Sequence, residues 1–432
     1  MSALLAGVAR VTITPPVGMY LPGMERTENS HGLRDDLYAT ALAVSDGTTE
    51  AIIVSCDLLM LHPSLVRRVR EEAAAQTGVP GANMMFCATH CHSGAVSYAW
   101  PSSRPMFRAY VENLGFLLVG VVRLAHDRMV PARLGYGRGE AHIGMNRRLT
   151  RPDGVTVIGP NPEGPVDPEL GLLRIDTAAG RPLAVLVNYA CHPVVLGNGS
   201  NVISADWPGA MRRTLELATG ATCLFVQGAG ADINPLPGVP SDDEAVLERL
   251  GTEIGGIALA TWAAVAPEPA GQVAVSGRRV LLPLLLPWAL EGRLPQFVEL
   301  GGAVEGLSWA EMQAMLAEPM PWTHDIVGEG DGRRVLMELQ AIRIGAGAVV
   351  SAAGEVFCRT GMEVKRRSPL AHTMFAGYTN GGVCYVPRPE DYPRGGYEVN
   401  EAYIGYRLPA PLAPEAAGIV EGTALDLLQQ LI

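Results

Sequence analysis

The sequence predicts one large α/β domain in which helices flank a mixed β-sheet. Three observations support this fold class: strand-like and helix-like segments alternate along all 432 residues, 48% of the residues are hydrophobic, and no linker divides the chain. That hydrophobic share is enough for a sizeable core in a chain of this length. Fifty glycines and 33 prolines predict many loops, which suits a site assembled from loops over a rigid sheet.

Each expected element follows from its hydrophobic pattern. Short apolar runs rich in β-branched residues predict strands, and longer segments with apolar residues three or four positions apart predict helices. In chain order we expect strand 51–56, helix 64–75, strand 83–88, helix 107–126, strand 183–190, helix 207–218, strand 222–226, helix 242–264, strands 273–282, 336–344 and 347–352, and a last helix 414–431. This order favours a mixed sheet over a purely parallel one.

Composition excludes some classes of partner. The chain has 33 Lys and Arg against 44 Asp and Glu, a net charge of −11, and no basic run, so nucleic acid is not expected to bind. The first ten residues lack the basic region and the long apolar stretch of a signal peptide. Seven cysteines occur singly, as is usual for small packed residues in a reducing compartment. We expect a cytoplasmic protein with a small-molecule substrate and no stable membrane association; whether it forms a homo-oligomer is open.

Residues 88–94, Ala-Thr-His-Cys-His-Ser-Gly, directly follow an apolar run. Side chains alternate along a strand, so His90 and His92 are expected to leave the same face of the strand's end. Two imidazoles side by side indicate a metal site. Two ordinary polar residues at a strand terminus are an equally good explanation of an isolated His-x-His.

Three other residues stand at comparable positions. His192 ends the apolar segment 187–191 and precedes a proline, Glu355 follows the expected strand 347–352, and Tyr385 precedes a proline-rich loop. Active sites of α/β folds assemble from sequence-distant residues at strand exits. Each residue also has a simpler explanation: a structural histidine, a helix N-terminal charge and a core tyrosine.

Taken together, these motifs resemble the catalytic domain of the neutral/alkaline, non-lysosomal ceramidases. The resemblance begins at Gly-Val-Ala-Arg-Val-Thr-Ile-Thr-Pro-Pro (7–16) and includes Thr-His-Cys-His-Ser-Gly (89–94), which is similar to the family's Thr-His-Thr-His-Ser-Gly. Met-Asn-Arg-Arg (145–148) resembles an Asn-Arg element that carries an active-site arginine. Tyr397, which lies 397 − 385 = 12 residues after Tyr385, stands where the family has a second active-site tyrosine.

The resemblance implies a single catalytic domain over residues 1–432 that holds one zinc ion per chain. His90, His192, Glu355 and Tyr385 would bind the zinc, and His92 would act as a general base or hold a water. Arg147 and Tyr397 would stabilise an oxyanion or anchor a substrate carboxylate. Asp57 and Asp232, each at a strand exit, are hypothesised to orient the zinc-binding imidazoles, with a turn-forming role as the alternative.

One residue departs from the family pattern. The segment Gly-Ala-Gly-Ala-Asp-Ile-Asn-Pro (228–235) resembles the family's Gly-Asp-Val-Ser-Pro-Asn loop but carries Asn234 in place of the serine. An amide cannot form an acyl-enzyme, whereas zinc can activate a bound water without any serine. Asn234 is then expected to donate a hydrogen bond to the substrate or to the developing oxyanion.

The expected function is therefore that of a zinc-dependent hydrolase. Zinc-bound water would attack an amide or ester bond of a small soluble substrate, such as an N-acyl compound. The ceramidases carry an additional immunoglobulin-like domain, and no such segment is evident in this sequence, so a bilayer-embedded sphingolipid is not the expected substrate. A zinc-dependent lyase or isomerase and a non-catalytic relative are the alternatives.

Overall fold

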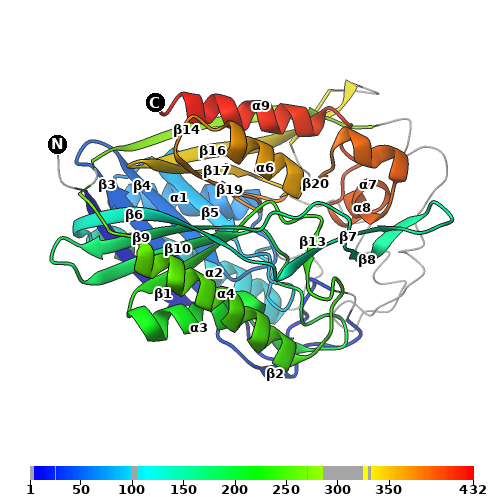
Figure 1. Cartoon of the computed structure of the whole chain (residues 1–432), viewed down its shortest axis with the longest axis horizontal. Helices are drawn as coiled ribbons and strands as arrows, with labels where there is room; N and C mark the ends of the chain where they lie inside the picture. The colour runs from blue at the N-terminus through cyan, green and yellow to red at the C-terminus, as the bar shows by residue number, and fades with distance from the viewer. Residues whose placement is uncertain (1–3, 25, 99–104, 270, 286–324, 329–331) are drawn as a thin grey trace.

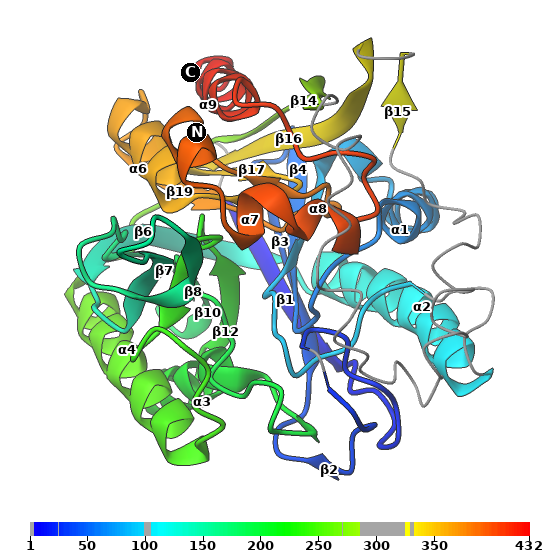
Figure 2. The same ribbon diagram turned by 90° about the vertical axis from the view of Figure 1, so that its right-hand side faces the viewer.

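The computed structural model describes residues 4–24, 26–98, 105–269, 271–285, 325–328 and 332–432. Strands and helices form an α/β fold with mixed sheets, as predicted. Figure 2 shows the arrangement most clearly: three groups of strands surround a common centre, and each group has helices on its outer side.

The largest sheet has eight strands in the order β12-β10-β9-β6-β1-β3-β4-β5. Most neighbours are antiparallel, but β4–β5 and β10–β12 are parallel pairs. Only two residue pairs join β1 to β6. The eight strands are β1 (Leu5–Thr12), β3 (Tyr38–Ser45), β4 (Glu50–Cys56), β5 (Met84–Ala88), β6 (Val130–Glu140), β9 (Glu169–Thr177), β10 (Pro182–Tyr189) and β12 (Thr222–Gln227).

The structure also contains a second, five-stranded sheet and three small sheets of two or three strands. The second sheet contains β14 (Val273–Pro283), β15 (Ile326–Val327), β16 (Arg334–Ile344), β17 (Gly347–Ala352) and β19 (His372–Ala376), of which β17 and β19 are parallel. The small sheets pair β2 (Gly32–Leu33) with β11 (Val202–Ile203), β7 (Gly144–Thr150) with β8 (Thr156–Asn161) and β13 (Ile233–Pro235), and β18 (Glu355–Val356) with β20 (Tyr385–Val386).

Helices cover the outer faces of the three strand groups (Figures 1 and 2). One pair packs over β1, β3, β4 and β5, a second over β9, β10 and β12, and a third over the five-stranded sheet. These pairs are α1 (Pro63–Thr77) with α2 (Pro105–Asp127), α3 (Asp206–Thr219) with α4 (Glu244–Ala264), and α6 (Cys358–Arg367) with α9 (Ala416–Gln429). Short helical segments are η1 (Gly81–Asn83), η6 (Pro389–Arg394), α7 (Tyr397–Asn400) and α8 (Ala402–Gly405).

Side chains that alternate along a strand contribute to two different cores, one under the helices and one at the centre of the molecule. In β4, Ile52 and Val54 face α1 and α2, whereas Ala51 and Ile53 face the centre of the molecule. Successive side chains of a strand point to opposite faces, so a continuous apolar run of this kind serves both cores at once. The central core lies between all three strand groups and contains buried side chains from each of them.

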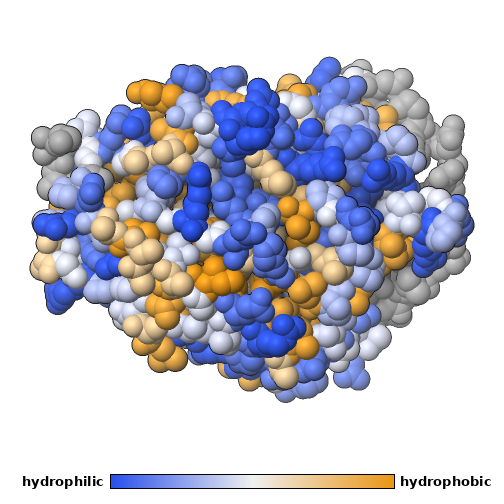
Figure 3. Space-filling view, viewed as in Figure 1, coloured by the Kyte–Doolittle hydropathy of each residue, from blue (hydrophilic) through white to orange (hydrophobic). Residues whose placement is uncertain are grey.

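By length and composition, helix α2 is the one helix in the described residues that could cross a bilayer. Nine of its residues are buried, and it packs against β1, β3 and α1. These contacts explain its apolar composition as that of a core helix. On the molecular face shown in Figure 3, hydrophobic side chains are interspersed with hydrophilic ones.

The elements expected from the sequence are all present, with ends that differ by at most two residues. The expected strand 51–56 is β4 (Glu50–Cys56), for example, and the expected helix 414–431 is α9 (Ala416–Gln429). The seven cysteines are free and buried, in agreement with their expected packing role.

Candidate metal centre

The ends of five strands meet at one end of the molecule. Backbone hydrogen bonds join them in turn: Ala88 N to Tyr378 O links β5 to β19, Gly377 N to Gln227 O links β19 to β12, and Gly228 N to Tyr189 O links β12 to β10. The end of β17 joins the same set through Thr379 N and Ala352 O. The residues that follow these strands are therefore held close together, which is where α/β folds build their sites.

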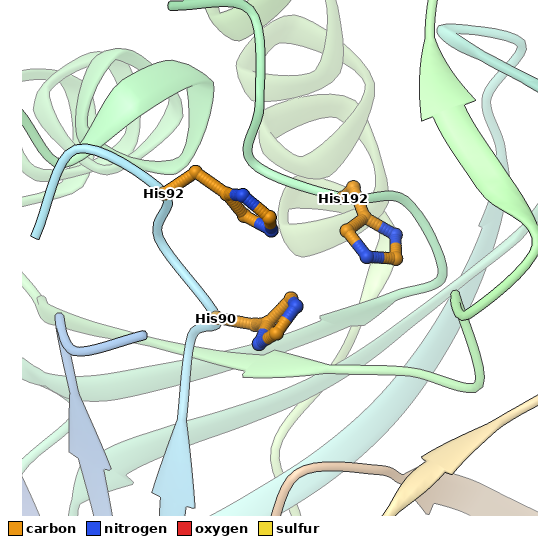
Figure 4. Close-up of side chains that lie close together, drawn as sticks. All are labelled: His90, His92 and His192. Atoms are coloured by element: carbon orange, nitrogen blue, oxygen red, sulfur yellow. The ribbon is translucent and has the colours of Figure 1, made fainter. Parts of the chain in front are cut away.

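Three histidines occupy this point, as Figure 4 shows. His90 and His92 come from the loop after β5, and His192 follows β10. One ring nitrogen of each lies within 4.8 Å of the others. The ring of His90 meets His92 edge-on at 4.8 Å between centroids and His192 at 4.9 Å.

Backbone carbonyls fix the orientation of each imidazole. Nδ1 of His90 contacts the Leu59 carbonyl at 2.8 Å, and Nδ1 of His92 contacts the Gly23 carbonyl at 2.6 Å. Nδ1 of His192 contacts the Gly230 carbonyl at 2.7 Å. Each Nδ1 must carry the hydrogen in such a contact, so each Nε2 carries a lone pair, as in histidine ligands of metals.

A carboxylate completes the cluster. Oε2 of Glu355 lies 3.5 Å from Nε2 of His90 and 3.4 Å from Nε2 of His192. The other oxygen, Oε1, accepts a hydrogen bond from the Tyr406 hydroxyl. Oε2 of Glu355 and Nε2 of His90 and His92 are buried and have no hydrogen-bond partner among the described residues.

Burial keeps the imidazoles neutral. It lowers the pKa of His90 to about 4 and that of His92 well below the ordinary value. The pKa of His192 is also lowered, by burial and by the nearby Arg147 cation. Burial alone would raise the pKa of Glu355, but the neighbouring imidazoles of His90 and His192 hold it at about 2. The cluster is thus composed of neutral imidazoles and an ionised carboxylate at neutral pH.

This donor set fits zinc. Buried polar atoms normally have hydrogen-bond partners, and unpaired ones require an explanation such as an ion. Neutral imidazole nitrogens and a carboxylate oxygen that converge on one point are typical of zinc sites, and their number and type suit magnesium or calcium less well. The imidazole of His92, predicted as a base beside the metal, is close enough to be a ligand itself.

Arg147, on β7, lies beside this cluster and is fully enclosed by protein partners. Its Nη1 donates to Nε2 of His192 at 3.2 Å and to Oδ1 of Asn234 at 3.3 Å. Its Nη2 donates to the Tyr385 hydroxyl at 2.9 Å, and its Nε to Glu398 at 2.9 Å. The guanidinium therefore connects four groups around the proposed metal, and Glu398 balances its charge.

The remaining predicted site residues lie around Arg147. Asn234, on β13, accepts from Arg147 and donates from Nδ2 to the Gly238 carbonyl at 3.1 Å, so its amide is already engaged within the protein. The ring of Tyr397 meets that of Tyr385 edge-on at 5.6 Å between centroids. Burial raises the pKa of both phenols, so both are protonated at neutral pH in the metal-free protein.

Two expectations about local geometry are wrong. The imidazoles are oriented by carbonyls and not by the two aspartates: Asp57 pairs with Arg212 at 2.9 Å, and Asp232 accepts from the Cys358 backbone N–H at 2.8 Å. The His-x-His residues also do not continue a strand. β5 ends at Ala88, and His90 has a left-handed backbone with φ of 63°. The two rings converge because the chain turns.

Sequence reasoning missed three buried residues of the site: Tyr378, Tyr406 and Glu398. The Tyr378 ring stacks on His90, Tyr406 contacts Glu355, and Glu398 contacts Arg147. A signal existed for the first of them, because Tyr378 follows β19 at a strand exit, as His90 and His192 follow theirs. Glu398 lies in α7 and Tyr406 directly follows α8, in a part of the sequence that shows no comparable pattern.

This chain is similar to one known protein family and to individual proteins of known name. The family model described as neutral/alkaline non-lysosomal ceramidase, N-terminal, matches residues 4–224. A protein named neutral ceramidase from Pseudomonas aeruginosa is 24% identical over 88% of this chain, and the match covers 65% of that protein, slightly less than two thirds. A protein of the same name from Mycobacterium tuberculosis is also 24% identical, over 88% of this chain and 70% of its own length.

Solved structures support the fold. The crystal structure of neutral ceramidase from Pseudomonas aeruginosa superposes with a TM-score of 0.73, at 21% identity, over 99% of this chain and 74% of that one. A structure described as ceramidase complexed with C2 gives a TM-score of 0.75, at 21% identity, over 99% and 75% of the two chains.

Proposed function

The chain belongs to the neutral/alkaline non-lysosomal ceramidase family, and from that premise we propose that it is a zinc-dependent hydrolase. The substrate we propose is a small N-acyl compound, cleaved at its amide or ester bond. The observation that carries the proposal is the convergence of unpaired Nε2 atoms of His90 and His92 with the unpaired Oε2 of Glu355 in a buried site.

We assign the zinc to His90, His192, Glu355 and Tyr385. Nε2 of His90 and Nε2 of His192 each lie within 3.5 Å of Oε2 of Glu355. The Tyr385 oxygen accepts a hydrogen bond from Arg147, which stabilises negative charge on a phenol oxygen and thereby favours it as a ligand. Zinc held there supplies a Lewis acid that polarises a carbonyl and lowers the pKa of water.

His92 is proposed to take the proton of the attacking water. Burial keeps its imidazole neutral by lowering its pKa, and its Nδ1 contact with the Gly23 carbonyl leaves Nε2 as the basic atom. Nε2 has no partner among the described residues, so it is free to accept a proton. Correct orientation of the base is a precondition of general base catalysis.

Arg147 and Tyr397 are proposed to stabilise the negative charge that develops on the carbonyl oxygen. Arg147 is a permanent cation, and its buried carboxylate partner Glu398 holds it at the centre. Tyr397 is a neutral phenol beside Tyr385 because burial raises its pKa. Preorganised donors in a dry site commonly contribute several kcal/mol of transition-state stabilisation.

Asn234 supports water as the nucleophile. An amide cannot form an acyl-enzyme, and both ends of this one are engaged, by Arg147 and by the Gly238 carbonyl. We therefore revise its role from an oxyanion donor to a residue that positions Arg147.

Metal analysis of the purified protein tests the ligand assignment. We expect about one zinc per chain, lost in His90→Ala and His192→Ala and retained in His92→Ala, which should lose activity alone. His142→Ala is the control, since that side chain is 67% exposed. Loss of zinc from His92→Ala would make this histidine a ligand, and full retention in His192→Ala would refute the ligand set.

A hydrolysis screen tests the reaction. Zinc-loaded protein is incubated with N-acyl amino acids, N-acyl amines, lactones, simple esters and a short-chain ceramide, and the released acid and amine or alcohol are quantified. We expect turnover of an N-acyl compound that disappears after metal removal and returns with zinc. A metal-dependent product formed without release of an acid would indicate a lyase or isomerase, and metal binding without any turnover would indicate a non-catalytic relative.

A further inference from the structure

Tyr378 is a buried residue in contact with two of the proposed metal ligands. It follows β19, is 4% exposed, and stacks on the ring of His90 at 4.2 Å between centroids and 29° between planes. Its ring meets the edge of His192 at 6.1 Å. No role follows for this tyrosine from the proposed ligand set.

The backbone of Tyr378 is held in an unusual conformation. Its φ is 58°, in the left-handed region that bulky residues rarely adopt and that occurs at sites where the surroundings fix the chain. Its N–H donates to the Gly354 carbonyl and its carbonyl accepts from the Ala88 N–H. The residue is thus tied to the chain segments that carry Glu355 and His90.

The hydroxyl of Tyr378 is the unexplained part. It is buried and has no hydrogen-bond partner within the described residues. Burial raises the pKa of this phenol, and the negative charge of the nearby Glu355 raises it further. Of the two Glu355 oxygens beside it, Oε1 already accepts from Tyr406. Oε2 has no hydrogen-bond partner among the described residues and lies 3.5 Å and 3.4 Å from Nε2 of His90 and His192, as expected of an oxygen that binds the metal. A buried phenol normally finds a partner.

We propose that Tyr378 is a further catalytic residue, whose hydroxyl donates a hydrogen bond to the substrate's carbonyl oxygen at the metal centre. The phenol keeps its proton throughout and contributes as a fixed dipole to the charge that forms on that oxygen. The stack on His90 holds the ring in place, and the left-handed backbone directs it toward the site. This inference rests on the proposed hydrolase function.

Ligand binding to the cobalt-loaded protein tests the proposal without knowledge of the natural substrate. Chelator-stripped protein is loaded with Co²⁺, and acetohydroxamate, which offers a carbonyl oxygen to the metal, is titrated while the visible absorption of Co²⁺ is followed. For Tyr378→Phe, which keeps the ring, we expect unchanged Co²⁺ affinity and about tenfold weaker acetohydroxamate binding, the loss of one hydrogen bond to a polarised oxygen.

Hydrolysis is measured in parallel, and two variants bracket the result. We expect kcat for Tyr378→Phe to fall about 100-fold. In the control Tyr110→Phe, the lost hydroxyl donates to the Ile13 carbonyl elsewhere in the core, and both acetohydroxamate affinity and kcat should match the unmodified protein. Tyr378→Leu also removes the stack on His90 and should weaken Co²⁺ binding in addition.

The results that would contradict this proposal differ from the result that would contradict the hydrolase function. Wild-type acetohydroxamate affinity in Tyr378→Phe or in Tyr378→Leu overturns the proposal. Loss of Co²⁺ from Tyr378→Phe also overturns it, because the hydroxyl would then act through Glu355. If the unmodified protein binds Co²⁺ and acetohydroxamate but hydrolyses nothing, the hydrolase function fails, while the comparison of the two affinities still decides whether the hydroxyl donates to the bound oxygen.

Discussion

Glu398 is predicted to stabilise the protein mainly by neutralising two buried arginines. Its side chain is 2% exposed and its two oxygens accept from Nε of Arg147 at 2.9 Å and from Nη1 of Arg148 at 2.5 Å. The side chains of Arg147 and Arg148 are 5% and 6% exposed. In Glu398→Gln the side-chain shape remains and the negative charge is removed. Removal of one partner of a buried ion pair costs about 3–5 kcal/mol, because the remaining charge is left uncompensated.

The lower end of that range is appropriate here. Arg148 retains Asp391 at 3.6 Å and the Gly395 carbonyl, and the glutamine oxygen still accepts one hydrogen bond. We therefore expect Glu398→Gln to lower the free energy of unfolding by about 3 kcal/mol. With an unfolding entropy of about 2.1 cal/mol/K per residue, this loss corresponds to a Tm about 3–4 °C lower for a chain of this size.

The pH dependence gives a second, independent readout. The pKa of Glu398 is lowered from its usual 4.5, because the two arginines outweigh the effect of burial. A carboxyl with a lowered native pKa stabilises the fold fully above its unfolded pKa and loses that contribution as the pH falls through the native value. The difference between Glu398→Gln and the unmodified protein should thus be constant from pH 7 to about 4.5 and shrink below that.

Urea unfolding of the metal-free proteins, followed by tryptophan fluorescence, measures the effect. Glu421→Gln is the matched control: Glu421 also pairs with two arginines, but Arg367 is 51% exposed and Arg388 is 23% exposed. Exposed pairs contribute less than about 1 kcal/mol. Equal losses in Glu398→Gln and Glu421→Gln would refute the reasoning, since burial of the partners would then make no difference.

Two further predictions concern the histidines. A Cβ added at Gly23 would lie 2.6 Å from the backbone Cα and O of His92, so Gly23→Ala should displace that imidazole, the proposed general base, and lower kcat by about tenfold or more while zinc is retained. Gly120→Ala, which has open space, should leave kcat unchanged, and equal rates in the two variants would contradict the packing argument. Burial lowers the pKa of His90 from 6.5 to about 4, so the unfolded chain binds more protons than the folded chain between these pH values. The metal-free protein should therefore lose about 3 kcal/mol of stability as the pH falls from 6.5 to about 4. Unfolding midpoints at pH 7.5, 6 and 4.5 check this, and the same dependence of stability on pH in His90→Gln would argue against it.

The sequence predicted the buried elements well and the exposed ones poorly. β4 and β10 are continuous apolar runs because both of their faces are covered, and such runs are recognisable without a structure. β6 contains three glycines and several charged residues, and most of its side chains are partly exposed. It is a strand because β9 pairs with it along nine residues. That tertiary contact overrides the weak local preference.

For the site, the residues that could bind a metal were predictable from the sequence, but the groups that orient them were not. His90, His192 and Glu355 stand at strand exits, and the structure brings them together. Their orientation depends on carbonyls and hydroxyls that come from distant segments, such as Leu59 for His90 and Tyr406 for Glu355. A backbone carbonyl has no residue-specific signature, so these partners could not be read from the sequence.

The His-x-His pair illustrates this limit most sharply, because its convergence has a different cause from the one its spacing indicates. His90 has a left-handed backbone, so the two-residue spacing does not set the direction of His92. That direction depends on Arg26, which is fully buried. Its Nη1 donates to the His92 carbonyl at 3.0 Å and to the Leu21 carbonyl at 3.1 Å, while its Nε donates to the Ser200 carbonyl at 2.6 Å.

Arg26 therefore joins three loops that surround His92. Its other nitrogen, Nη2, reaches the Ser93 hydroxyl and the Gly197 carbonyl, so every hydrogen bond it makes in the described residues goes to a neutral oxygen. Burial lowers its pKa, yet an arginine keeps its charge, and five neutral acceptors must replace its water shell. Such a costly arrangement is tolerated only where the surrounding chain is held firmly. The rigidity of the metal centre on the His92 side thus depends on a residue 66 positions earlier in the sequence.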